Sequence, residues 1–279
     1  MLPVHIGLIS RSKGLSSGDL MRTAAALQKQ VTRDYAPIWH IAATVSAFAA
    51  LKDVPIGYWP VIVMDDIHSR GAAGYHQDRR GQPYALVQMS DSWSLTASHE
   101  TLEMLTDPFG NRLVSGRSPK KGQGRVDFLV EVGDPCEDAA FAYTVNGITV
   151  SDFITPAFYD PVPSPSTRYS FQGAVTKPRD VLKGGYLSWH EPVTDHWWQE
   201  VWFDTAKPSY RDLGVMGRLT ASLRSTIDSM TRVPQIQQGL KATDPRLAAF
   251  KSLADDVDAS AEARAAQLTK DIEDLVRRK

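Results

Sequence analysis

The sequence predicts an α+β fold, in which a mixed, twisted β-sheet with one polar helix forms residues 1–205 and a helical extension forms residues 206–279. Three observations predict it. Short apolar runs typical of strands alternate with helical periodicity early in the chain. Asn146-Gly147 lies between two further apolar runs, which indicates a β-hairpin. Beyond about residue 207, apolar residues recur at steps of three and four, as in amphipathic helices.

The composition excludes several classes of protein. The chain has 279 residues, of which 42% are hydrophobic and 23% charged, and its formal net charge is −1. This balance provides no basic surface for nucleic acid or for an anionic membrane. Cys136 is the only cysteine, which excludes an intramolecular disulfide. No apolar run reaches membrane-spanning length and no signal-peptide pattern is present, so we expect a cytoplasmic protein.

The elements before residue 108 follow one another in an informative order. Strand, helix, three strands and a second helix succeed one another, with a glycine-rich, charged loop before the last strand. The strands are predicted at residues 4–9, 40–48, 56–64 and 84–89, the first helix at 20–35 and the loop at 69–81. Pro108 ends the second helix.

The second helix carries the polar residues that point to chemistry. His99 and Glu103 are four apart and share one helix face, Asp107 follows one turn later, and Glu100 is next to His99. This is the layout of the zincin motif H-E-x-x-H, with Glu103 in place of the second histidine. On a solvated helix the same pattern is only surface charge.

A hydrolytic zinc ion explains why these residue types would occur together. It takes three protein ligands from imidazole nitrogen or carboxylate oxygen and leaves one position open. His99 and Glu103 would be ligands, and Glu100 would be the general base that takes a proton from water. A carboxylate in place of an imidazole lowers the net charge of the site, which admits manganese, iron or calcium as alternatives to zinc.

The third ligand must come from another part of the chain. Residues 108–124 read as a solvent loop and residues 126–132 as a strand, which ends in a second acidic cluster. Glu131 and Asp134 of that cluster are the candidates for the third ligand, and Asp107 is a further one. Without a metal, Asp134 before Pro135 would simply begin a turn.

The later segments add weaker candidates. Gly184-Gly185 is a turn into a strand that begins near Tyr186, and by analogy with zincins Tyr186 would stabilise an oxyanion. Aromatic residues and histidines that follow could form a pocket, or the tryptophans could pack under the hairpin, which we prefer; they are His190, His196, Trp197, Trp198 and Trp202. His76, in the glycine-rich loop, is the one remaining histidine worth testing. Cys136 could reach the metal as an inhibitory thiolate or be a small buried residue.

Several motifs together resemble a zincin-like family of bacteria and their phages, whose members are described as metallopeptidases of unassigned function. The motifs are Ser-His-Glu-x-x-Glu-x-x-x-Asp-Pro from Ser98, Glu-Val-Gly-Asp-x-Cys from Glu131 and Val-Ser-Asp-Phe-Ile-Thr-Pro-Ala-Phe-Tyr-Asp-Pro from Val150, within residues 56–190. The resemblance implies His99, Glu103 and one or both of Glu131 and Asp134 at the metal, with Glu100 as base. In zincins the strand before the active-site helix is often an edge strand that pairs with extended peptide, and residues 84–89 would be that strand.

The C-terminal extension suggests an alternative function. Helices are predicted at residues 213–230 and 244–279, the second with a narrow, alanine-rich apolar seam. Such a seam could dock on the body of the protein or join another subunit or protein partner. The chain is therefore either a metal-dependent, peptidase-like hydrolase acting on peptide or protein, or a non-catalytic phage structural or assembly protein. The latter would keep a zincin scaffold and could be associated with the virion.

Overall fold

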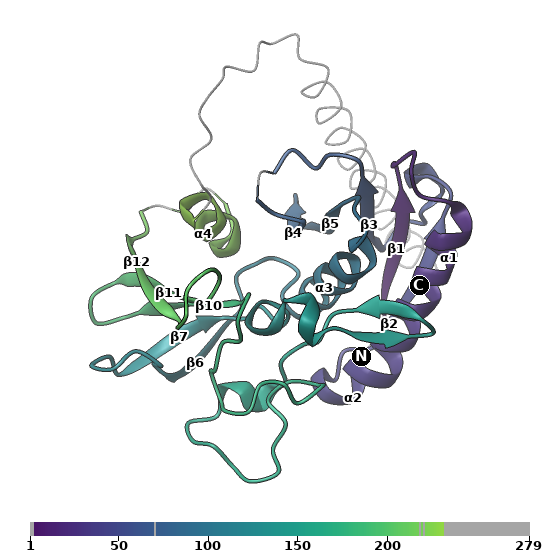
Figure 1. The fold of residues 1–279 in the computed structure, drawn as a ribbon. Coiled ribbons are helices and arrows are strands. Elements are labelled where there is room, and N and C mark those ends of the chain that lie inside the picture. The colour runs from purple at the N-terminus through teal and green to yellow at the C-terminus, as the bar shows by residue number, and fades with distance from the viewer. Residues whose placement is uncertain (1–2, 70, 218, 220, 232–279) are drawn as a thin grey trace, which may run out of the picture.

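The computed structural model describes residues 3–69, 71–217, 219 and 221–231. Within these residues the fold is mixed α+β, with two five-stranded sheets, one two-stranded hairpin and few helices (Figure 1). The predicted fold class is confirmed at this level. The helix expected at 244–279 lies outside the described residues.

The first sheet has the strand order β2-β1-β3-β5-β4. β2, β1, β3 and β5 run parallel to one another, and β4 pairs antiparallel with β5. The strands are β1 (Val4–Ser10), β2 (Ala43–Phe48), β3 (Tyr58–Met64), β4 (Gly74–Arg79) and β5 (Gln82–Gln88). All of them except β4 lie where apolar runs predicted strands. The interior strands β1, β3 and β5 are largely buried on both faces, whereas β2 is an edge strand and only partly buried.

β2 and β4 are the two edge strands of this sheet, and β4 is the one beside β5. The expectation that residues 84–89 form the edge is therefore wrong. Arg80 and Gly81 join β4 to β5 with φ of 50° and 81°, the left-handed conformations of a two-residue hairpin turn. Half of the segment expected to be a loop at 69–81 is therefore a strand. β5 carries the apolar residues and is buried between β3 and β4, whereas the polar β4 is at the border.

Two helices cover one face of this sheet. α1 (Ser17–Lys29) starts at Ser16, whose hydroxyl accepts from the amide of Asp19, and continues through a π-helical turn (Gln30–Tyr35) into α2 (Ala36–Trp39). α3 (Trp93–Thr106) ends before Pro108, as predicted. Both α1 and α3 share a core with alternate residues of the strands, among them Ile6, Leu8, Val61, Val63, Ala85 and Val87. In Figure 1, α3 lies between this sheet and the second sheet.

The second sheet is antiparallel, with the order β12-β11-β10-β7-β6. Its strands are β6 (Leu113–Arg117), β7 (Arg125–Leu129), β10 (Tyr186–Glu191), β11 (His196–Val201) and β12 (Ser209–Val215). The expected solvent loop at 108–124 is wrong in part, because residues 113–117 form β6. The helix expected at 213–230 is also wrong in its first part, because β12 extends to Val215 and its pairing with β11 satisfies the backbone of this exposed segment.

The described part of the C-terminal extension packs on the body of the protein. The predicted domain boundary at 205/206 falls between β11 and β12, which are hydrogen-bonded neighbours. α4 (Leu223–Thr231) follows, and its Ile227 is buried with Leu129 and Trp197. This apolar contact holds α4 against the second sheet. No helix among the described residues is both long and apolar enough to cross a membrane.

The predicted hairpin and the aromatic residues behave as expected. β8 (Tyr143–Val145) and β9 (Ile148–Val150) are joined by Asn146 and Gly147, both with positive φ. Trp197 is buried, and Trp198 and Trp202 pack against the main core. The tryptophans are therefore packing residues, as preferred, but Trp197 packs with Leu129 and Ile227, and a position under the hairpin is not confirmed.

Glu200 of β11 is a buried carboxyl group outside the region of the polar helix. One of its carboxylate oxygens, Oε2, has no hydrogen-bond partner among the described residues. Burial, with a smaller contribution from Asp180, raises the pKa of Glu200 to about 7. The charged form of this side chain therefore destabilises the folded state at neutral pH.

We expect Glu200→Gln to stabilise the protein increasingly as the pH rises. Well below pH 4.5, the carboxyl is protonated in both states, whereas above pH 7 it is ionised in both states and only the folded wild type bears the cost of a buried charge. The gain from pH 5 to pH 8 should be about 2 to 3 kcal/mol, from the size of the pKa shift. Urea unfolding at both pH values measures it, with the exposed Asp204→Asn as control. A gain independent of pH would contradict the assignment.

Candidate metal centre

α3 brings three polar residues into the interior. His99, Glu100 and Glu103 are only 8%, 3% and 0% exposed, so the interpretation of the motif as charge on a solvated helix is wrong. One helical turn separates His99 from Glu103 and leaves Nε2 of His99 3.3 Å from Oε1 of Glu103. The spacing recognised in the sequence thus produces a pair of buried donors.

The segment that follows β7 crosses in front of α3. Asp134 Oδ1 lies 3.2 Å from Nε2 of His99, and the amide of Gly133 donates to Oε1 of Glu103 at 3.1 Å. Oxygens of Glu103, Glu131 and Asp134 lie within 4.8 Å of one another. Both acidic residues expected from this segment therefore reach the helix.

The other candidate for the third ligand, Asp107, does not join the cluster. Its carboxylate accepts from the amide of Arg112 at 2.7 Å and so orders the turn after α3. Its carbonyl oxygen lies 3.0 Å from Nε2 of His76. Asp107 therefore supports a neighbouring side chain from outside the cluster.

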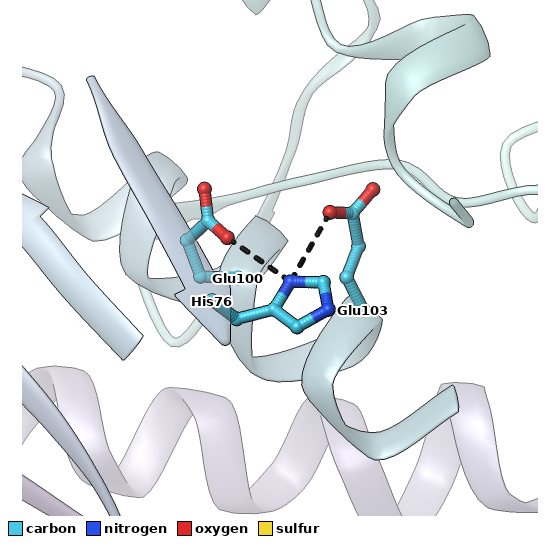
Figure 2. Close-up of side chains that lie close together, drawn as sticks. All are labelled: His76, Glu100 and Glu103. Atoms are coloured by element: carbon cyan, nitrogen blue, oxygen red, sulfur yellow. Dashed lines mark ion pairs between the residues drawn. The ribbon is translucent and has the colours of Figure 1, made fainter. Parts of the chain in front are cut away.

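His76 reaches the cluster from the edge strand β4. Its Nδ1 lies 3.4 Å from Oε2 of Glu100 and 3.6 Å from Oε2 of Glu103 (Figure 2). The sequence marked His76 for testing but placed it in a loop and gave it no partner. Only the β4–β5 hairpin, which lays β4 beside α3, brings these side chains together.

Glu137 is a further acidic residue that the sequence analysis missed. A carboxylate oxygen of Glu137 can lie with donors of His99 and Asp134 within 4.8 Å. Asp134 and Glu137 are three apart at a 3₁₀ turn (Asp134–Cys136), a spacing that stacks side chains. That spacing could have indicated Glu137, but we expected residues 131–137 to be the end of a strand and not a helical turn.

Arg224 of α4 is the cation of the cluster. Its Nη1 donates to Oε2 of Glu103 at 2.5 Å and contacts Oε2 of Glu131. The start of α4 is anchored because the amide of Arg224 donates to the carbonyl of Gly110 at 3.0 Å. The sequence analysis missed Arg224 because it assigned residues 213–230 to a separate extension.

Burial, attraction between opposite charges and repulsion between carboxylates together set the protonation of the metal-free cluster. Burial alone would lower the pKa of His99, but the carboxylates of Glu103 and Asp134 outweigh it and raise that pKa well above its ordinary value. Burial opposes ionisation of Glu103 too, yet His99 and Arg224 lower its pKa. Burial and then Glu103 raise the pKa of Asp134 well above the usual range. Burial raises the pKa of Glu137 to about 7.

A cavity of about 630 Å³ opens onto the cluster. Its walls include His99, Glu100, Asp134 and Tyr186, together with residues 71–74 at the start of the edge strand. Tyr186, expected to stabilise an oxyanion, thus lies on the wall of this cavity. Cys136 is 1% exposed, and burial raises the pKa of its thiol well above the ordinary value, which fits a small buried residue.

The donor set fits a divalent metal ion. Two ligand atoms that each lie 2.0–2.2 Å from a tetrahedral ion are roughly 3.3–3.6 Å apart, close to the separations of His99 Nε2 from Glu103 and Asp134. Oδ2 of Asp134 and Oε1 of Glu131 are buried without hydrogen-bond partners among the described residues. Imidazole nitrogen with carboxylate oxygen suits zinc, manganese or iron.

We expect Gly133→Ala to weaken metal binding. A Cβ at position 133 would lie 2.4 Å from Nδ1 of His99, so the imidazole would have to move away from Glu103 and Asp134. Displacing a ligand in this way should reduce the affinity for Zn²⁺ by roughly 10- to 100-fold. Titration calorimetry on the metal-free protein measures it. Gly124→Ala, whose Cβ would meet nothing within 4 Å, is the control, and equal affinities in both variants would contradict the geometry.

We expect Arg224→Met to make the fold more dependent on metal. Loss of the guanidinium leaves buried carboxylates without their counter-charge, which should cost the metal-free protein roughly 3–5 kcal/mol. A cation then has more negative charge to neutralise, so Zn²⁺ should raise the melting temperature of the variant more than that of the wild type. Thermal melts with chelator and with Zn²⁺ test this, with the exposed Arg168→Met as control. Equal zinc-induced shifts would refute it.

The geometry of the cluster and its cavity is what points to a function. Comparison of the chain with protein-family models, with curated proteins and with solved structures found no match. The zincin-like family thus remains a resemblance of motifs.

Proposed function

We propose that the protein is a zinc-dependent hydrolase of peptide bonds. One observation carries the proposal: Nε2 of His99, Oε1 of Glu103 and Oδ1 of Asp134 converge at separations of 3.2 and 3.3 Å from the imidazole, beside a cavity. These three side chains would hold the metal, with Glu131 close behind them. A fourth position would face the cavity, as a hydrolytic site requires.

The arrangement of β4 and α3 supports a zincin-like architecture with an extended peptide as substrate. β4 is the antiparallel border of the first sheet, and α3 packs beneath it. Residues 71–74 lead into β4 and line the cavity. An extended peptide could add to this edge through backbone hydrogen bonds and so lay its scissile bond across the cluster.

Glu100 is the proposed general base. It is next to His99 on α3, lines the cavity and accepts no hydrogen bond at Oε2 from the described residues. Zinc, when bound, supplies a Lewis acid that makes water acidic near neutral pH. The Glu100 carboxylate takes the proton from the attacking water and returns it to the leaving amine as the peptide bond breaks.

Arg224 compensates for the carboxylate that replaces the second histidine. Glu103 brings a negative charge that an imidazole would not, which by itself would weaken the Lewis acidity of the metal. The guanidinium on Oε2 withdraws part of this charge, while Oε1 faces His99. The Glu103–Arg224 pair therefore approaches a neutral ligand. Tyr186, on the cavity wall, would donate its hydroxyl to the oxyanion that forms on the scissile carbonyl.

We expect Glu100→Gln to abolish turnover while the fold and the zinc ion held by His99 persist. Without a base, the rate should fall by roughly 10²- to 10⁴-fold. The assay measures cleavage of a fluorogenic peptide library by zinc-loaded protein, with elemental analysis and circular dichroism of each variant. Glu191→Gln is the control, since Glu191 is a buried carboxylate that accepts from Gln123 and is absent from the cavity walls. Unchanged turnover in Glu100→Gln would exclude this mechanism.

A second candidate function is that of a structural or assembly protein, such as a phage component, in which the cluster only stabilises the fold. The contacts of Arg224 with Glu103 and Glu131 favour it, since these carboxylates already have a cation. Wild-type protein that binds zinc stoichiometrically yet cleaves no member of the library would support this second function.

A further inference from the structure

His76 completes a second set of metal donors on the opposite side of Glu103. We propose that the cluster binds a second divalent transition-metal ion through Nδ1 of His76, a carboxylate oxygen of Glu100 and Oε2 of Glu103. The protein would then carry a two-metal centre in which Glu103 is the shared ligand.

The hydrogen bond of His76 leaves the correct nitrogen available. Nε2 lies 3.0 Å from the carbonyl oxygen of Asp107, and because a carbonyl can only accept, Nε2 carries the hydrogen. In the neutral imidazole, Nδ1 then has a free lone pair. Nδ1 is fully buried and has no hydrogen-bond partner among the described residues. Metal-binding histidines are commonly oriented in this way, by a backbone carbonyl on the other ring nitrogen.

The distances around Nδ1 fit a shared ion better than direct hydrogen bonds. Nδ1 is 3.4 Å from Oε2 of Glu100 and 3.6 Å from Oε2 of Glu103, as Figure 2 shows. A nitrogen–oxygen hydrogen bond would be about 2.9 Å long. Ligands of one tetrahedral ion are roughly 3.3–3.6 Å apart, and the three side chains can place donor atoms within 4.8 Å of one another.

Glu103 faces both sets of donors with different oxygens. Oε1 is 3.3 Å from Nε2 of His99, and Oε2 is 3.6 Å from Nδ1 of His76. Oε2 also accepts from Nη1 of Arg224 at 2.5 Å, so an ion beside His76 would use the second lone pair of this oxygen. A carboxylate whose two oxygens point to two donor sets can bridge two ions, as in two-metal hydrolytic sites. Glu100 could still serve as base, since its Oε1 lies on the side of Gly74, a residue of the cavity wall.

The formal charge of the cluster also calls for more than one cation. Five carboxylates share this region with one guanidinium, that of Arg224; they are Glu100, Glu103, Glu131, Asp134 and Glu137. In the metal-free cluster, protons on His99, Asp134 and Glu137 offset part of this charge. Metal binding displaces such protons from the ligands, and with all five carboxylates ionised and the imidazoles neutral, one divalent ion would balance half of the excess negative charge and two would balance all of it. Uncompensated charge in a buried site is costly, so the second ion stabilises the fold.

The first test counts ions with Zn²⁺ as the probe. Metal-free, full-length protein is saturated with Zn²⁺, freed of excess metal by gel filtration and analysed for metal content. We expect two equivalents in the wild type and one in His76→Gln, whose amide can still donate to Asp107 while the ligand nitrogen is gone. His99→Asn should also retain one equivalent, and the double variant none. His5→Gln is the control, because His5 lies on β1 and its Nδ1 is hydrogen-bonded to Thr44 of β2, and this variant should retain two equivalents of zinc.

The second test needs no variant and therefore holds even if His76→Gln fails to fold. Wild-type protein loaded with ¹¹³Cd²⁺ should give two cadmium resonances, both in the range of nitrogen and oxygen ligands. A single resonance, or one zinc equivalent that persists in His76→Gln, would overturn the second site and leave His76 as an ion-pair partner of both carboxylates. That result would leave the proposed hydrolase intact, because the hydrolase requires only the ion lost in His99→Asn.

Discussion

The buried carboxylate of Glu103 is the group on which the site depends. It is 0% exposed, and an ion in such a position is tolerable only if charged or polar donors surround it. Three segments supply these donors. They are His99 of α3, the amide of Gly133 in the segment after β7, and Arg224 of α4. Removing any one partner leaves the buried charge of Glu103 less well compensated, so the three segments are energetically coupled through one side chain.

Each partner of Glu103 is itself held by the backbone of another segment. The imidazole of His99 packs where only a glycine at 133 leaves space, and Arg224 starts a helix whose amide is bound to the carbonyl of Gly110. His76 is oriented by the carbonyl of Asp107. The donors are therefore positioned before any ligand arrives, which is the condition for strong electrostatic effects in a protein interior. The same rigidity explains why so much negative charge can be concentrated beside one cavity.

Local sequence patterns predicted the structure correctly where a single helix or hairpin determines the conformation. The 3.6-residue periodicity of α3 placed His99, Glu100 and Glu103 correctly, and Asn146-Gly147 marked a real hairpin. The patterns gave wrong predictions where a segment is a strand only because a neighbouring strand pairs with it. β4 has a polar, glycine-containing sequence and is a strand because β5 pairs with it, and β12 is a strand because β11 does. Strand formation depends on pairing partners more than on intrinsic preference, so such segments read as loops or helices.

By itself, the sequence determined the helix that carries His99, Glu100 and Glu103, and it named Glu131 and Asp134 as the acidic residues that could join it. Only the tertiary structure decided that Asp107 stays outside the cluster, that β4 forms the edge, and that His76, Glu137 and Arg224 join. The reason is distance along the chain. Arg224 and Glu103 are 121 residues apart, and their contact results from packing of Ile227 on the second sheet, which no local periodicity encodes.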